Sequence, residues 1–135
     1  MNYSVEEARS IFIHDRYAMV TTGIDILEVA DGYCKCCFKL DERHKNALGS
    51  VMGGALYTLA DFVFAVATNY NKPYSTVTSV SSISYLRGCK EGTIFAESKM
   101  IKDGRLSCTY EVEITSEEGK LLAVVTINGI HLPKA

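Results

Sequence analysis

The strongest hydrophobic pattern in the chain is a nearly unbroken apolar run over residues 51–67, in which Asp61 is the single charged residue. Lys72-Pro73 follow soon after it, and a proline stops a helix because it has no amide hydrogen to donate. The run begins with a glycine pair and carries a charge near its middle, which argues against a membrane span. We therefore predict a helix at residues 53–70 that is buried in the core.

Most of the remaining chain alternates apolar and polar residues, as strands with one buried face do. Two strands are expected at residues 23–30 and 33–40, around Asp31-Gly32, a pair typical of a tight hairpin turn. Four more strands are expected after the helix, at residues 76–86, 93–102, 105–115 and 120–132.

The first residues carry the pattern of a capping box, Ser4 with Glu7, which predicts a short helix that runs to about Asp15. A short helix, a hairpin, a long apolar helix and a long antiparallel run together indicate an α+β fold. We expect one domain, residues 1–135, in which the sheet wraps around the central helix.

The composition is that of an ordinary globular domain, with 47% hydrophobic residues, 22% charged residues and a net charge of −2. This balance offers no basic surface to nucleic acid or to an anionic membrane, so neither is expected as a partner. The N-terminus opens with acidic residues and lacks the basic-then-apolar order of a signal peptide, which predicts a cytoplasmic protein.

The cysteines predict free thiols. They are Cys34, Cys36, Cys37, Cys89 and Cys108. An odd number, with no CxxC pair and no neighbouring histidine, argues against a disulfide framework and against a zinc site, so no metal is expected. Free thiols indicate a reducing compartment. His14 and His131 are isolated in the sequence and indicate no function by themselves.

Asp61 is the only charged residue between Lys45 and Lys72. A carboxylate in apolar surroundings is costly unless it is paired, hydrogen-bonded or protonated, so a chemical role is one explanation for it. A structural role is the other: the side chain caps a neighbouring loop or faces a water-filled notch.

Gly53 and Gly54 lie where the polar loop becomes the helix. Without Cβ atoms they let a ligand approach the backbone, and the first turn of a helix offers unpaired N–H groups to a negatively charged oxygen. The pair therefore suits an oxyanion hole. The alternative is that the glycines only let the helix start pack tightly against the sheet.

The spacing of Gly53 and Asp61 adds a geometric constraint. Eight residues of helix separate them by roughly 12 Å, at 1.5 Å per residue, whereas reacting groups need to lie about 3 Å apart. If both residues act on one substrate, Asp61 has to come from a second, antiparallel copy of the helix. This chemistry predicts a two-fold dimer with two composite sites.

These residues belong to a longer motif with matching spacings at Asn46, Gly49, Gly53, Gly54, Leu59, Ala60 and Asp61. The motif resembles the active-site segment of the hotdog-fold acyl-CoA thioesterases, in their PaaI-like (phenylacetic-acid-degradation) branch, and similar residues continue through the later strands. The resemblance implies a hotdog fold, an acyl-CoA substrate, hydrolysis without a metal or redox cofactor, and homodimers that pair into homotetramers.

The resemblance also implies roles for single residues. Asp61 would activate water or attack the thioester, and the Gly53 N–H of the facing subunit would polarise the thioester carbonyl. Asn46 would orient the loop or the substrate. A hydroxyl on the strand after the helix would steady Asp61 or its water. Alignment from Ile83 and Tyr85 makes Thr78 the first candidate and Ser79 the second, and only one of these neighbours can face the site. The alternative is that Thr78 is a simple β-branched strand residue.

Residues expected to contact the substrate are Met52, Gly54, Tyr85, Arg87 and Arg105, with Lys90 and Lys102 as further candidates for the CoA phosphates. The pocket floor is expected to include Tyr57, Phe62 and Phe64. The acyl group itself cannot be read from these residues.

Met52 is the one departure from the motif, because the family usually has a histidine before the two glycines. Methionine offers only a weakly accepting sulfur. An active enzyme with altered rate or acyl preference is the first interpretation, and a non-catalytic acyl-CoA binder, either a sensor or a carrier, is the alternative. His44 is a possible substitute for the missing side chain, although a loop histidine beside Lys45 is expected to be solvated. A hydratase is disfavoured, since no Asp/His pair has the short spacing it needs.

Overall fold

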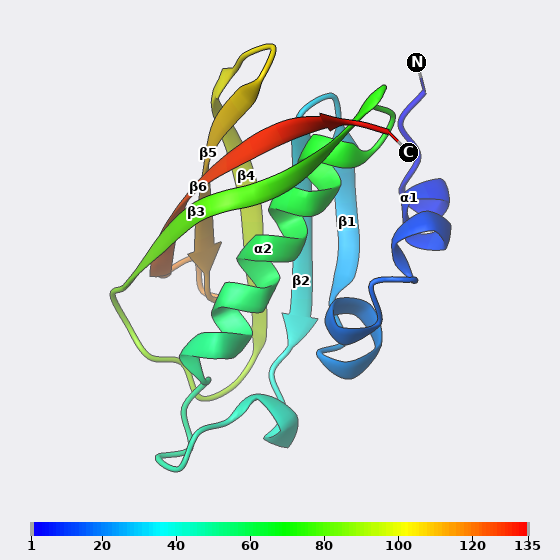
Figure 1. Ribbon diagram of the computed structural model, residues 1–135. Helices are drawn as coiled ribbons and strands as arrows, with labels where there is room; N and C mark the ends of the chain where they lie inside the picture. The colour runs from blue at the N-terminus through cyan, green and yellow to red at the C-terminus, as the bar shows by residue number, and fades with distance from the viewer. Residues whose placement is uncertain (1, 135) are drawn as a thin grey trace.

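A computed structural model describes residues 2–134 and contains a six-stranded antiparallel sheet that curves around one long helix (Figure 1). The strands lie in the order β1-β2-β4-β5-β6-β3, so β1 and β3 form the two edges. Their bounds are β1 (Asp25–Ala30), β2 (Tyr33–Lys39), β3 (Tyr74–Tyr85), β4 (Thr93–Asp103), β5 (Ser107–Thr115) and β6 (Leu121–Pro133). This confirms the predicted α+β architecture, with a short N-terminal helix beside the sheet.

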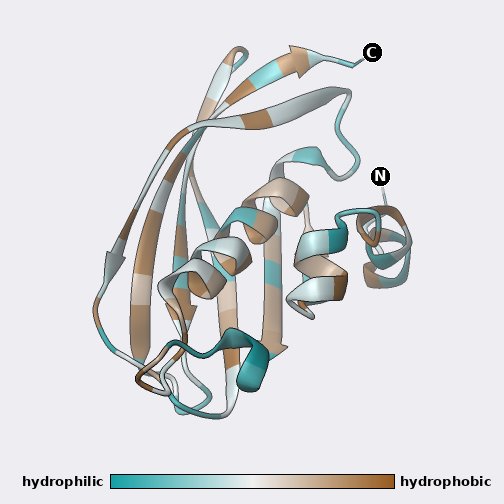
Figure 2. Cartoon of the chain, turned by 60° about the horizontal axis from the view of Figure 1, so that its bottom comes forward, coloured by the Kyte–Doolittle hydropathy of each residue, from teal (hydrophilic) through white to brown (hydrophobic). Residues whose placement is uncertain are grey.

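The central helix, α2 (Gly53–Asn69), lies on the concave face of the sheet and supplies much of the core. Leu59, Ala60 and Val63 are fully buried. The apolar colouring of the helix and the strands behind it contrasts with the hydrophilic loop that precedes α2 (Figure 2). No helix among residues 2–134 is both long and apolar enough to cross a bilayer, in agreement with the prediction of a core helix.

Period-two burial in the sheet follows the sequence pattern. On β5 the alternate residues Cys108, Tyr110, Val112 and Ile114 are buried, and on β2 Cys34 and Cys36 are buried. All five cysteines are free, as predicted. The hairpin between β1 and β2 turns at Gly32, whose positive φ of 68° is the conformation that favours glycine.

The N-terminal helix, α1 (Val5–Phe12), is shorter than predicted. Ser4 caps it, since its Oγ accepts a hydrogen bond from the Glu7 N–H at 3.2 Å. In a full capping box the Glu7 side chain would accept from the Ser4 N–H, but here Tyr70 lies between them. The Ser4 N–H donates to the Tyr70 hydroxyl oxygen at 3.2 Å, and that hydroxyl donates to the Glu7 carboxylate at 2.7 Å. The helix start is thereby tied to the end of α2.

Two short helical segments were not predicted. A π-helical turn, η1 (Tyr17–Thr21), follows α1, and a 3-10 turn, η2 (Glu42–His44), lies in the loop before α2. Contacts with a distant part of the chain help to hold both turns. The Arg43 guanidinium of η2 donates to the Thr21 carbonyl of η1 at 2.9 Å, and the His44 ring donates to the Thr22 carbonyl at 2.7 Å. The η2 turn also has a local capping box, formed by Asp41 and His44.

Candidate active site

Asn46 organises the loop that leads into α2. Its Oδ1 accepts from the N–H groups of Leu48 at 2.9 Å and Ser50 at 3.1 Å, and its own N–H donates to the Ser50 carbonyl at 2.8 Å. Gly49 closes the loop with φ +80°. These bonds place Asn46 as the residue that shapes the loop, which is one of the two roles predicted for it.

The start of α2 lacks a side-chain cap. Met52 is the N-cap residue, and its side chain makes no capping hydrogen bond. The helix bonds begin with Ala55 N and Leu56 N, both donated to the Met52 carbonyl. The first N–H groups of a helix have no partner inside it, so those of Gly53 and Gly54 remain available beside the positive end of the helix dipole.

The two glycines have different surroundings. A Cβ on Gly53 would lie 2.8 Å from the Tyr85 ring, and the Tyr85 hydroxyl donates to the Gly53 carbonyl at 2.9 Å. A Cβ on Gly54 would meet nothing within 4 Å. The packing explanation therefore applies to Gly53, whose missing side chain makes room for Tyr85, while Gly54 faces open space.

Asp61 lies on the exposed face of α2, one helical turn beyond Tyr57 and Thr58. It lines an open depression of about 460 Å³ between α2 and β3. Two of the other lining residues, Tyr57 and Ser81, are joined by a hydrogen bond between their hydroxyl groups. The carboxylate is therefore accessible from solvent in the single chain.

The surroundings of Asp61 disfavour its charged form. Desolvation by its neighbours raises the pKa of the Asp61 carboxyl, and the negative charge of Asp15 raises it further. Desolvation also raises the pKa of Asp15, partly offset by His14. A carboxyl whose pKa moves toward neutrality is suited to take up and release a proton.

Thr78 lines the same depression as Asp61, as predicted. The neighbouring Ser79 turns away, because its hydroxyl donates to the Asn128 carbonyl at 3.1 Å. The register of β3 against β6 shifts between Thr78 and Val80, so Ser79 sits at an irregularity of the ladder. Of the two hydroxyl candidates, the structure brings Thr78 together with Asp61.

Met52 and Gly54 line a second depression, which also involves Tyr17 and His44. The Met52 side chain is 57% exposed. The expectation that His44 is solvated was wrong: the ring is buried against Phe38, with ring centroids 4.4 Å apart. Its Nδ1 accepts from the Asp41 N–H at 3.0 Å, so Nε2 is the nitrogen that donates to the Thr22 carbonyl. Both nitrogens are engaged, and His44 has none to offer a substrate.

The basic candidates separate into two groups. Arg87 and Lys90 lie with Lys120 around a depression of about 360 Å³. Their loop is bonded to the segment before α2, since the Val51 N–H donates to the Cys89 carbonyl at 2.8 Å. Lys102 and Arg105 line a different depression, by the hairpin between β4 and β5.

Asp15 and Tyr17 are residues that the sequence patterns did not single out. Tyr17 is 68% exposed and lines both depressions, so it lies between the Asp61 region and the Met52 region. Neither residue belongs to the helix motif, and the π-helical turn that positions Tyr17 has no local sequence signature. Only the tertiary fold brings this segment to α2.

The arrangement supports hydrolysis of a carbonyl compound. An accessible carboxyl with a raised pKa has the chemistry of a general base, and N–H groups at an uncapped helix start have the chemistry of oxyanion donors. No metal ligand lies among the residues that line the Asp61 depression, apart from Asp61 itself. These are the parts required for water to attack an ester or thioester.

Comparison with known proteins agrees with this chemistry. Residues 48–123 match the thioesterase superfamily model. A candidate esterase from Archaeoglobus fulgidus is 34% identical over 100 residues, which make up 73% of this chain and 64% of that protein. Acyl-coenzyme A thioesterase PaaI from Escherichia coli is 28% identical over 88% of this chain and 84% of its own length.

Solved structures give the same result for the fold. A mutant form of the phenylacetic acid degradation protein PaaI from Thermus thermophilus superposes with a TM-score of 0.78 at 31% identity, over 84% of this chain and 97% of that one. The matched segment of the family model runs from the loop before α2 into β6, and so includes the helix with both glycines and Asp61. The chain therefore belongs to the thioesterase superfamily, as a PaaI-like hotdog protein, and is a thioester hydrolase.

Proposed function

We propose that this protein is an acyl-CoA thioesterase that releases a free acid and CoA, with Asp61 as the general base or nucleophile. One observation carries the proposal: the start of α2 has no side-chain cap, and Gly54 there faces open space. On the same face of the helix lies the accessible carboxyl of Asp61, whose pKa is raised. The names of the PaaI relatives support acyl-CoA as the substrate class.

The active unit is a two-fold dimer in which each site combines Asp61 of one subunit with the Gly53 N–H of the other. Gly53 and Asp61 lie on one continuous helix, so roughly 12 Å of helix rise separates them and they cannot serve one carbonyl. The edge strand β3 supports this assembly, because it exposes Val77 and Val80, the latter by 62%. Exposed apolar edge strands are normally covered by another chain.

In each composite site the thioester carbonyl accepts from the N–H at the helix start, while Asp61 removes a proton from water or attacks the carbonyl carbon. Thr78 steadies the carboxyl or its water from β3. Arg87 and Lys90, whose loop is bonded to the segment before α2, hold the CoA phosphates. Arg105 and Lys102 lie around a separate depression and are the weaker candidates for this role.

Met52 affects the acyl preference more than the chemistry. Its thioether replaces a polar ring beside the oxyanion site, which makes the entrance more apolar and suits an aliphatic or aromatic acyl group. The loss of one polar contact reduces a rate without removing the base or the oxyanion donors.

A panel of acyl-CoA thioesters tests the proposal on wild type, Asp61→Asn and Met52→His. Wild type should release one CoA for each ester consumed, and Asp61→Asn should reduce kcat by about 10³-fold while its native mass stays that of the assembled protein. Met52→His should change the ranking of the substrates. Thermal stabilisation by acyl-CoA without hydrolysis would instead favour the non-catalytic binder, and unchanged turnover in Asp61→Asn would refute the role of Asp61.

A further inference from the structure

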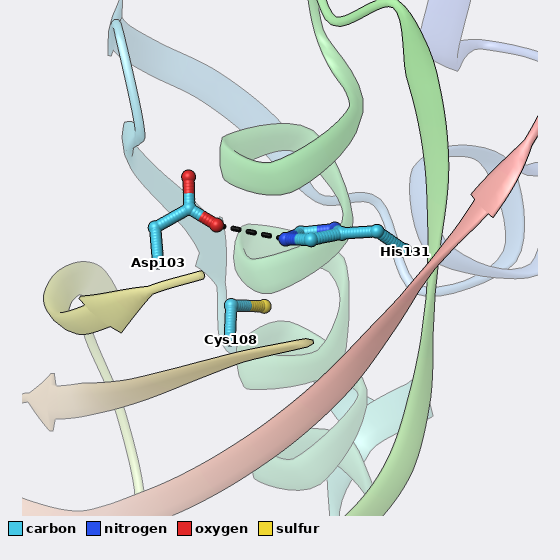
Figure 3. Close-up of side chains that lie close together, drawn as sticks. All are labelled: Asp103, Cys108 and His131. Carbon is cyan, nitrogen blue, oxygen red and sulfur yellow. Dashed lines mark hydrogen bonds and ion pairs between the residues drawn. The ribbon is translucent and has the colours of Figure 1, made fainter. Parts of the chain in front are cut away.

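A cluster of three potential metal ligands lies near the C-terminal end of α2, away from the depression around Asp61. Asp103 ends β4, Cys108 lies on β5 and His131 on β6, and one ligand atom from each lies within 4.8 Å of the other two. Figure 3 shows His131 pointing from its strand toward Asp103, with the Cys108 thiol beside them. Within residues 2–134 no other three His, Cys, Asp or Glu side chains meet as closely.

Hydrogen bonds hold the His131 ring in one orientation. The Thr76 hydroxyl contacts the Thr68 carbonyl at 3.3 Å and His131 Nδ1 at 2.7 Å. A hydroxyl has one hydrogen, so two arrangements fit these contacts. If that hydrogen goes to Nδ1, the shorter contact, the ring donates from Nε2 to Asp103 Oδ1 at 2.8 Å. If it goes to the Thr68 carbonyl, the ring donates from Nδ1 to Thr76, and Nε2 presents its lone pair to Asp103 Oδ1.

The first arrangement is complete without a further group, whereas the second is the one that a metal ion on Nε2 requires, because two acceptor atoms 2.8 Å apart repel one another unless a positive charge lies on or between them. One solution is a second ring proton, which makes an imidazolium–carboxylate pair. The other is a metal ion, which would also use the neighbouring thiol. The pair alone does not involve the thiol of Cys108, which lies beside it.

A nucleophilic triad does not fit these residues. Burial and the charge of Asp103 raise the pKa of the Cys108 thiol, which disfavours the thiolate that attacks substrates. The two ring nitrogens of His131 are hydrogen-bonded to Asp103 and Thr76 and not to the thiol, so no Cys–His hydrogen bond is present to activate the sulfur.

We propose that Asp103, Cys108 and His131 bind a divalent zinc ion. A carboxylate and a thiolate neutralise its two charges, and oxygen, sulfur and nitrogen are the donors that zinc takes in proteins. A tetrahedral site places ligand atoms about 3.5 Å from one another, which rotation of the partly exposed Asp103 side chain allows. Thr76 has the position of the outer residue that accepts the second ring N–H of a metal-bound histidine.

The surroundings leave a path for the ion and one open ligand position. His131 is 4% exposed at its side chain and Asp103 is 26% exposed, so the ion enters past Asp103. Cys108 also lines the depression of about 470 Å³ that contains Lys102 and Arg105. Water or a small anion from this depression supplies the fourth ligand. Zinc binding releases the thiol proton, and any proton on Nε2, to solvent.

The direct test is metal binding by the full-length protein after chelator treatment and desalting. We expect one zinc per chain by elemental analysis, and a thiolate-to-metal charge-transfer absorption when Co(II) replaces zinc. Titration calorimetry in buffers of different ionisation enthalpy should show proton release. Wild type that holds no zinc and gives no such absorption would overturn the proposal and leave the hydrogen-bonded pair of His131 and Asp103.

Variants locate the site. Cys108→Ser and Asp103→Asn should each weaken zinc binding by at least about 100-fold, and Thr76→Val by about tenfold. Cys37→Ser, a matched change of a half-buried thiol elsewhere, should bind as wild type does, and so should Asp61→Asn. Zinc that remains bound at full affinity in Cys108→Ser, or that is lost in Asp61→Asn, would place the ion elsewhere. The wild-type Co(II) measurement holds even if a variant fails to fold.

Discussion

At its C-terminal end α2 is held by side chains on several sides, whereas at its N-terminal end it carries no side-chain cap. Asn69 alone makes three inter-segment or capping bonds there: its Nδ2 donates to the carbonyls of Ala65 and Thr76, and its Oδ1 accepts from the Thr76 N–H at 2.8 Å. At the other end Met52 contributes no side-chain bond and Gly54 faces open space.

The contrast indicates that the C-terminal end of α2 is structural and that its N-terminal end is available for substrate binding. At the C-terminal end, polar groups whose hydrogen bonds are satisfied fix α2 against β3 and thereby fix the direction of the helix. At the start, N–H groups without a hydrogen-bond partner cost stability, because helix caps normally satisfy them. The cost is consistent with donors that are kept free for a substrate oxygen, and substitutions at the two ends can test this division.

Among changes at the two ends of α2, the largest effect is expected at Gly54. The Cβ of a valine there meets nothing within 4 Å, and its side chain fills the space through which a thioester reaches the backbone. We expect kcat/KM to fall about 100-fold with the thermal midpoint of unfolding unchanged. The matched change Gly53→Ala displaces Tyr85 and should alter stability as well as rate. Full activity in Gly54→Val would show that the substrate does not approach the helix start.

At the C-terminal end of α2, Asn69→Ala should reduce the stability of the protein and leave its rate of catalysis unchanged. It leaves the half-buried Thr76 N–H without its acceptor, so we expect the free energy of unfolding to fall by about 2 kcal/mol, with kcat unchanged in the folded protein. Denaturant titration and steady-state kinetics measure the two effects. Asn69→Asp keeps the acceptor and loses the donors, so it should fall between wild type and the alanine variant. A selective loss of kcat at full stability would contradict the division between the two ends.

The same contrast explains what the sequence could predict. The core helix, the strands and the Asp31-Gly32 turn each have a local pattern of burial or turn chemistry, and all are present. The short η1 turn and the early end of α1 were missed because tertiary contacts position them. At the candidate site, the motif pointed to Asp61, Gly53 and Gly54, and its continuation at Ile83 and Tyr85 put Thr78 before Ser79, of which Thr78 lines the Asp61 depression.

Other residues could not be read from the sequence because their partners lie far away along the chain. His44 looked solvated but stacks on Phe38, and its nitrogens bond to backbone groups of Asp41 and Thr22. The cysteine spacing argued against a zinc site, yet the sheet brings Cys108 to His131 from a separate strand. Contacts between residues that are far apart in the sequence depend on the strand order, which local patterns do not specify.

Adding a cap should exchange activity for stability. Met52→Ser places a hydroxyl where it accepts from the N–H of Gly54 or Ala55, which should raise the free energy of unfolding by about 1 kcal/mol. It should reduce kcat by about tenfold if the Gly54 N–H assists Gly53 in binding the substrate oxygen. Met52→Leu has a similar volume and no acceptor, so both quantities should stay near wild type. If Met52→Ser gains stability without losing rate, the Gly54 N–H takes no part in binding the oxyanion, and Gly53 has to act alone.

The smallest effect is the pH dependence contributed by Asp61. Its pKa in the folded protein is raised by desolvation and then by Asp15, so the folded state keeps this proton over a pH range in which the unfolded chain has released it. Stability therefore falls as pH rises through that range, and the full cost is present at neutral pH. Asp61→Asn removes the cost and should be more stable than wild type at pH 7, by only about 0.5 kcal/mol, because solvent screens an exposed group.

The difference between the two proteins should shrink as the pH is lowered and vanish below about pH 3, where the carboxyl is protonated in both states. Urea titrations of wild type and Asp61→Asn at several pH values measure it. Asp15→Asn serves as the control for the second cause, since it should lower the pKa of Asp61 and move the acid limb of kcat/KM to lower pH. If Asp61→Asn is less stable than wild type at pH 7, the ionised Asp61 makes a stabilising contact. The stability cost in α2 would then come from the uncapped N–H groups at the helix start and not from Asp61.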